Sequence, residues 1–210
     1  MYVLVQDGAV AAYPYSVASL RADNPETSFA MEMPDERLAD FGVFPVLETE
    51  RPAAAVGYAL VEGTPEASVG GWRQTWSLIE RDLAEVKDEL RAMLTRQRDT
   101  ILQGGWTHDF GVAGVHTLDL RHADDKANWT LLLIKTQGMI AAGGGGAMIT
   151  IRTAANASIN VTATEANAAM VAFLGWGEAV LAHKWNLDEE IAEADLAALG
   201  AIDVEAGWPS

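Results

Sequence analysis

The stretch GGWTHDFGVAGVHTLDLRHADDKANW, residues 104–129, begins with paired glycines that end a helical segment and leads into the second half of the chain. It holds three of the four histidines in the protein. Imidazoles and carboxylates this close in sequence are the components of a metal site or an acid–base pair. The histidines and aspartates of this stretch are His108, His116, His122, Asp109, Asp119, Asp124 and Asp125.

The local pattern favours a folding element over a reactive site. The segment 107–121 predicts a β-hairpin whose turn lies around Gly111 to Gly114. Because side chains alternate along a strand, His116 and Leu118 share a face and Asp119 points away from it.

After the hairpin, Asp124 or Asp125 can cap the free N–H groups at the start of the next helix. No two of these histidines have the four-residue spacing that places both imidazoles on one metal ion. We therefore expect strand and capping residues here, with no catalytic, cofactor-binding or metal-binding residues in the chain.

Composition limits the possible functions. The chain has 210 residues, a net charge of −16 and no cysteine. Such acidity repels nucleic-acid phosphates and anionic headgroups, and the missing thiols exclude disulfides and thiolate metal sites. The N-terminus lacks the basic residues and apolar core of a signal peptide. No apolar run approaches the roughly 20 residues that span a bilayer, so we expect no membrane insertion.

Charge divides the chain into three parts. Residues 1–71 carry eleven acids and three bases, residues 72–103 carry six of each, and residues 104–210 carry thirteen acids and five bases. With the element pattern, this predicts an α+β protein. Its parts are a small β-rich attachment domain (1–76), a helical connector (77–103) and a C-terminal α+β domain (104–210) with short β-hairpins and two main helices.

Several elements are predicted within these parts. Asp7-Gly8 favours a two-residue hairpin turn near the N-terminus. Residues 125–143 predict a mostly buried helix, and 147–154 and 158–163 predict two strands joined by a turn. Thr162 and Glu165 form a capping box before a long helix at 165–194. The tryptophans within or beside these elements are expected to pack in the core: Trp72, Trp76, Trp129, Trp176 and Trp185.

The helix at 82–103 has an apolar row at alternating spacings of three and four, formed by Leu83, Val86, Leu90 and Met93. This row fits the contact positions of a coiled coil for about two heptads. Two interpretations stay open: the helix packs on its own domain, or it forms a short oligomerising seam with a partner.

A family resemblance accompanies these patterns. The stretches AYPYSVASLRADNPETSF (12–29), LADFGVFPV (38–46) and ERP (50–52) resemble the start of many tailed-bacteriophage tail-fibre-type proteins. Ala30 and Phe41 depart from that pattern, which usually has proline and tyrosine there. The segments WRQTWSLIE (72–80) and RQRDTIL (96–102) are similar to the connector that follows in such proteins.

From Arg98 onward the chain resembles a phage domain of unknown function that is common in tail-fibre and tail-assembly proteins. The matching stretches are RDTILQGG (98–105), HTLDLRHADDKANW (116–129), ITIRTAANASINVTATE (149–165) and the final helix. The resemblance implies a non-enzymatic structural protein of a tailed-phage virion, in the tail fibre, baseplate or tail attachment. The resemblance also implies that the protein is made in the host bacterial cytoplasm, contacts other tail proteins and can form a homo-oligomer.

Two other functions stay open. The first alternative is a tail-fibre assembly chaperone that is not retained in the particle. The second is a polysaccharide-active enzyme of the tail.

Overall fold

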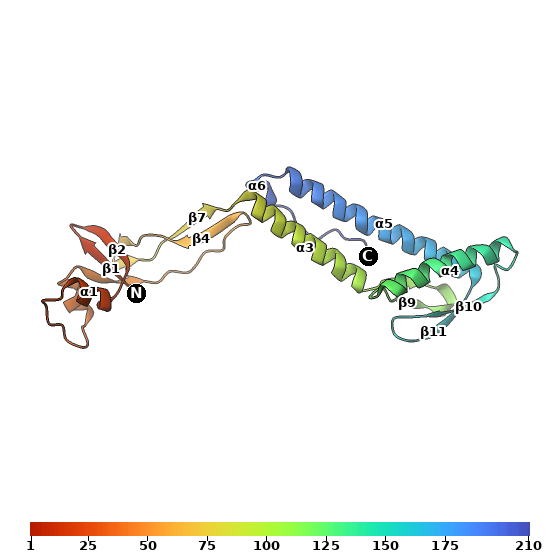
Figure 1. Ribbon diagram of the computed structural model, residues 1–210, viewed down its shortest axis with the longest axis horizontal. Coiled ribbons are helices and arrows are strands. Elements are labelled where there is room, and N and C mark those ends of the chain that lie inside the picture. The colour runs from red at the N-terminus through yellow and green to blue at the C-terminus, as the bar shows by residue number, and fades with distance from the viewer. The chain divides into compact units, whose positions relative to one another are not determined.

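The computed structural model describes residues 1–122 and 124–210. The chain divides into two compact units, an N-terminal unit (Met1–Asp82) and a C-terminal unit (Leu83–Ser210). The fold is α+β, as the sequence predicts: the first unit is rich in strands and the second combines long helices with short hairpins (Figure 1). None of the helices in the described part of the chain is long and apolar enough to cross a membrane.

The N-terminal unit is built on a five-stranded sheet with the order β2-β1-β3-β6-β5. Strand β1 (Tyr2–Gln6) pairs antiparallel with β2 (Ala9–Tyr15) and with β3 (Val43–Leu47), whereas β6 (Gly71–Arg73) runs parallel to β3 and antiparallel to β5 (Glu66–Ser68). Asp7 and Gly8 both have positive φ in the first turn, which confirms the predicted hairpin.

Two short helices complete this unit. Helix α1 (Val17–Asp23) is capped by Ser16, whose hydroxyl accepts the Ser19 N–H, and helix α2 (Asp35–Ala39) starts after Pro34. They cover a small core made of Tyr15, Leu20, Leu38 and Val43.

The expected connector at 77–103 begins later than the sequence predicts. Strand β7 (Trp76–Glu80) pairs over its whole length with β4 (Tyr58–Glu62), so these residues form a ladder and not a helix. Helix α3 (Leu83–Gln103) belongs to the C-terminal unit, where it packs against the long helix α5 (Ala163–Glu193).

The C-terminal unit continues with β8 (Trp106–Asp109), the short helix η1 (Gly111–Ala113), β9 (Val115–Leu118) and α4 (Ala123–Ala141). Strands β10 (Met148–Arg152) and β11 (Ser158–Thr162) form the second predicted hairpin, and α6 (Leu196–Leu199) follows α5. Helices α3 and α4 both lie beside α5 (Figure 1).

One row of α5 makes the main core. Ala166, Ala169, Met170, Trp176 and Val180 are buried against residues from both hairpins, including Trp106, Leu118, Ile151 and Val161. The predicted capping box holds the start of this helix: the Thr162 hydroxyl accepts the Glu165 N–H, and the Glu165 carboxylate accepts the Thr162 N–H.

The prediction that α4 is mostly buried is wrong. Thr136 is buried, but Leu131 and Ile134 are 62% and 60% exposed. Apolar residues lie on all sides of α4, but only one side of the helix packs on the core. The partly buried side chains on that side are Trp129, Leu132, Leu133 and Met139. Apolar sequence alone therefore overstated the burial of this helix.

Candidate functional site

The hairpin of β8 and β9 brings together two histidines that lie eight residues apart. The strands are antiparallel with His108 directly opposite His116. The Asp109 carboxylate accepts the Gly111 N–H at 2.9 Å, and Gly111 and Gly114 both have positive φ. The predicted turn is confirmed. The sequence did not predict this pairing, because a register symmetric about Gly111 to Gly114 would place Thr117, and not His116, opposite His108.

Both imidazoles are packed among aromatic rings and backbone. The ring of His108 stacks on Trp106, with centroids 4.6 Å apart, and meets the edge of Phe110 at 5.0 Å. His116 Nε2 lies 2.7 Å from the Ala113 carbonyl oxygen. His116 shares its face with the buried Leu118, as predicted, because both belong to alternate positions of one strand. These contacts give the two histidines a packing role.

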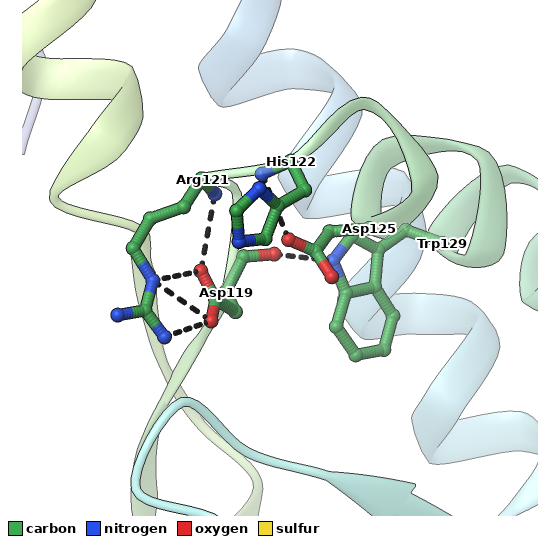
Figure 2. Close-up of polar contacts among 5 residues, drawn as sticks. All are labelled: Asp119, Arg121, His122, Asp125 and Trp129. Atoms are coloured by element: carbon green, nitrogen blue, oxygen red, sulfur yellow. Dashed lines mark hydrogen bonds and ion pairs between the residues drawn. The ribbon is translucent and has the colours of Figure 1, made fainter.

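The segment after β9 is a compact polar junction, shown in Figure 2. Arg121 Nε donates to both carboxylate oxygens of Asp119, at 2.9 and 3.0 Å, and the Arg121 backbone N–H donates to Asp119 Oδ1 at 3.0 Å. These hydrogen bonds hold the pKa of the Asp119 carboxyl well below its usual range. The same pairing raises the pKa of Arg121. A carboxylate held in this ionised form is poorly suited to exchange protons near neutral pH.

The junction also starts helix α4. The backbone N–H of His122 donates to Asp125 Oδ2 at 2.9 Å, so Asp125 is the carboxylate that caps the helix (Figure 2). Trp129 Nε1 donates to the Asp119 carbonyl oxygen at 2.8 Å and ties the helix to the segment that follows β9. Asp124 lies exposed in the first turn. The predicted capping is confirmed, and it is Asp125 that makes the contact.

The seven polar residues do not converge on one point. His108 and His116 lie on the hairpin, whereas His122 is the N-cap of α4. Within residues 1–122 and 124–210, no group of three or more histidine, aspartate or glutamate side chains is placed to hold a metal ion. The structure thus arranges this stretch as hairpin, ion pair and helix cap.

The apolar row predicted on α3 is divided by the structure. Val86 and Leu90 are buried with Leu94 against α5 and the C-terminal segment, where their partners are Leu187, Ile191, Leu199 and Val204. Leu83 and Met93 are exposed instead. The buried residues Val86, Leu90 and Leu94 are each four residues apart, so the buried row of α3 continues to Leu94 and not to Met93. Val86 and Leu90 therefore serve packing within the chain, the first of the two interpretations left open.

The sequence did not predict an apolar pocket that the C-terminal unit contains. A pocket of about 410 Å³ lies between the end of α3, the start of α4 and the middle of α5. Lys126 and Glu178 are the charged residues at its wall, and the apolar part comes from Leu102, Leu120, Phe173, Leu174, Trp176 and Leu181. A volume of this size accommodates one or two large side chains of a binding partner.

Four of the five tryptophans assigned to the core are buried or partly buried, but Trp185 is 57% exposed and that prediction is wrong for it. It lies on α5 beyond the pocket, on the side facing away from Val180 and Leu187. The helical spacing of the sequence separates the two tryptophans of α5, because Trp176 falls in the buried row of that helix and Trp185 does not.

Comparison with known proteins gives a family for this unit. No curated protein and no solved structure matches the chain significantly. The model of the family described as Domain of unknown function (DUF4376) matches residues 85–206, more than half of the chain and nearly all of the C-terminal unit. The protein belongs to this family.

Proposed function

We propose that the protein is a structural component of a tailed-phage virion and acts in the tail through contacts with other proteins. The tail context is supported by the resemblance of residues 12–52 to tail-fibre-type proteins and by the similar resemblance from Arg98 onward. The action through contacts is supported by a structural observation, the apolar surface of the C-terminal unit. Its place would be the phage tail, after synthesis in the host cytoplasm.

Exposed apolar side chains carry the proposal. Leu131 and Ile134 lie one turn apart on α4 and Trp185 lies on α5, and each is more than half exposed. Neighbouring large apolar side chains left in water are a feature of surfaces that bind another protein.

The N-terminal unit would dock on the tail or baseplate. It has a pocket of about 540 Å³ between residues 27 and 41, whose apolar wall includes Phe29, Met33, Pro34 and Phe41. The backbone carbonyls of Ala30 and Met31 accept hydrogen bonds from Arg21 at 2.7 and 2.9 Å, which fixes the loop beside the pocket. The wall also includes the charged residues Glu32, Arg37 and Asp40. A preformed pocket of this mixed character suits an anchoring side chain of a larger assembly.

Mass spectrometry of purified particles tests the virion role. We expect the chain in particles of the phage that encodes it, at a constant ratio to a known tail protein through successive density-gradient steps. Particles that are infectious and contain no trace of it would overturn the proposal and favour the assembly chaperone.

A polysaccharide assay tests the enzymatic alternative. Purified protein incubated with host surface polysaccharide is expected to release no new reducing ends. Release that disappears in His116→Ala or Asp119→Ala, while both variants keep the wild-type circular dichroism spectrum, would establish the enzyme and overturn the structural role.

A further inference from the structure

The segment that follows α6 returns between α3 and α5 as a short strap, residues 203–209 (Figure 1). Two apolar side chains hold it there. Val204 is 4% exposed and belongs to the apolar cluster that α3 and α5 form with the end of the chain. Trp208 packs on this cluster and also on the main core of the unit. The strap therefore connects the two apolar clusters of the C-terminal unit.

The strap is fixed by side chains and not by backbone pairing. His183 Nε2 donates a hydrogen bond to the Ala206 carbonyl oxygen at 3.0 Å, and the His183 and Trp208 rings meet edge to face with centroids 4.7 Å apart. Trp176 Nε1 donates to the Pro209 carbonyl oxygen at 3.3 Å. In the described part of the chain, no backbone-to-backbone hydrogen bond joins the strap to another segment. Two hydrogen bonds and the packing of a few side chains thus hold the strap in place.

The packing of the strap against α3 is incomplete. A pocket of about 180 Å³ lies between the two, and Val204 and Glu205 line it on the side of the strap. Four of the seven strap residues are exposed, and Val204 is the only buried one. A segment with few buried contacts and no backbone ladder opens at a lower free energy than the core that it covers.

Gly207 allows the strap to lie close against α5. Its φ is +78°, and a Cβ at this position would come within 2.9 Å of the His183 ring. Any other residue would meet both an unfavourable backbone conformation and the imidazole. Substitution of Gly207 is therefore a way to loosen the strap without altering a core side chain.

We propose that the strap is a lid that opens as a unit while α3 and α5 stay folded. Opening would withdraw Val204 and Trp208 and expose apolar side chains of the two clusters that the strap connects. The closed strap would thereby control access to the apolar surface between α3 and α5. A closed and an open form of this kind are two states of one folded protein. The inference does not rest on the virion role.

Thiol labelling tests the opening in the full chain, which has no cysteine of its own. Val204→Cys places a thiol on the inner side of the strap, where dithionitrobenzoate reaches it only after opening. Val180→Cys is the matched control, because Val180 lies on α5, is 0% exposed and becomes accessible only when the helix unfolds. We expect Val204→Cys to react at least about 100-fold faster than Val180→Cys.

The urea dependence of labelling separates local from global opening. The rate for Val204→Cys should change little at low urea concentrations, because opening of the strap exposes little surface. The rate for Val180→Cys should rise steeply, because it requires unfolding of the unit. Equal rates, or equally steep urea dependences, in two variants with native circular dichroism spectra would overturn the proposal.

NMR of the His183 imidazole tests the strap without a cysteine. The Trp208 ring lies against this imidazole in the closed form, so opening changes the His183 proton shifts. Gly207→Ala is expected to move these shifts toward their unfolded-chain values while the circular dichroism spectrum stays native. Gly200→Ala is the matched control, because Gly200 has a φ of −66° and its added Cβ would meet no atom closer than 3.5 Å. Unchanged His183 shifts in Gly207→Ala, or equal changes in both variants, would refute the lid.

Discussion

The polar junction at residues 119–129 and the exposed side of α5 lie in the same unit and differ in whether their side chains have partners within the chain. In the junction, Asp119 accepts hydrogen bonds from Arg121, and Asp125 accepts the His122 N–H. On the exposed side of α5, Val171 and Trp185 are more than half exposed to solvent. Charged groups that are paired within the chain favour a structural role for the junction, whereas exposed apolar side chains are the better candidates for contacts with another molecule.

The largest effect expected from this comparison concerns the two sides of α5. Met170 is buried and its neighbour Val171 is 53% exposed. Met170→Ala should lower the free energy of unfolding by about 3 kcal/mol, because it leaves a cavity in the core. Val171→Ala should change it by less than about 0.5 kcal/mol when the protein is dilute enough to be monomeric. Urea denaturation followed by circular dichroism measures both.

Equal losses in the two variants at low concentration would contradict the comparison, since they would place Val171 in a packed environment within one chain. A loss of stability for Val171→Ala that appears only at high protein concentration would show that the Val171 side chain contacts a second copy of the chain.

A smaller effect is expected for the cap of α4. Asp125→Ala removes the acceptor of the His122 N–H and should lower the free energy of unfolding by about 1 kcal/mol. Asp124→Ala is the matched control, since it removes a carboxylate from the same helical turn. It should cost about 0.3 to 0.5 kcal/mol through the helix dipole alone. Thermal unfolding of the two variants side by side makes the measurement, and the reverse order would show that Asp124 is the cap.

The smallest effect concerns pH. The pKa of Asp119 is lowered in the folded protein by its hydrogen bonds from Arg121. A lowered pKa contributes stability that is fully present above the unfolded-state value of about 3.9 and is lost as the pH falls toward the folded-state value. The stability difference between wild type and Asp119→Asn should therefore be constant from neutral pH to about pH 5 and shrink below about pH 4.

Urea titrations of both proteins across this pH range, with a carboxyl-carbon NMR titration of Asp119, make the measurement. A difference that stays constant or grows on acidification would mean that Arg121 does not bind this carboxylate in solution.

Local chemistry made much of this structure predictable. Asp7-Gly8 requires positive φ at two successive positions, and the Thr162–Glu165 box satisfies two free N–H groups within one turn. The hairpin predicted within 107–121 and the predicted cap by Asp124 or Asp125 follow from the same kind of short-range rule, and the structure has the strands at 106–109 and 115–118 and the cap at Asp125. Such features depend on neighbours in sequence and can be predicted without knowing the rest of the fold.

The errors have a common physical cause. Residues 77–80 of the predicted connector belong to strand β7, because their pairing partners in β4 lie 16 to 22 residues earlier in the chain. Leu131, Ile134 and Trp185 were expected to be buried from their apolarity, yet burial depends on what packs against each side of a helix. The pairing of His108 with His116 depends on the exact register of the hairpin, which the two turn glycines alone do not fix.

The fold class, the hairpin turns and the helix caps by Glu165 and by Asp124 or Asp125 were predictable from the sequence, because apolar periodicity, short-range hydrogen bonds and backbone preferences fix them. The Asp119–Arg121 ion pair and the side of each helix that is buried became known only from the folded structure. The buried row of α5 and the division of the α3 row arise from contacts between segments distant in sequence. An apolar residue in the sequence shows that burial of its side chain is favourable. Whether the side chain is buried within the chain depends on the packing of the whole unit.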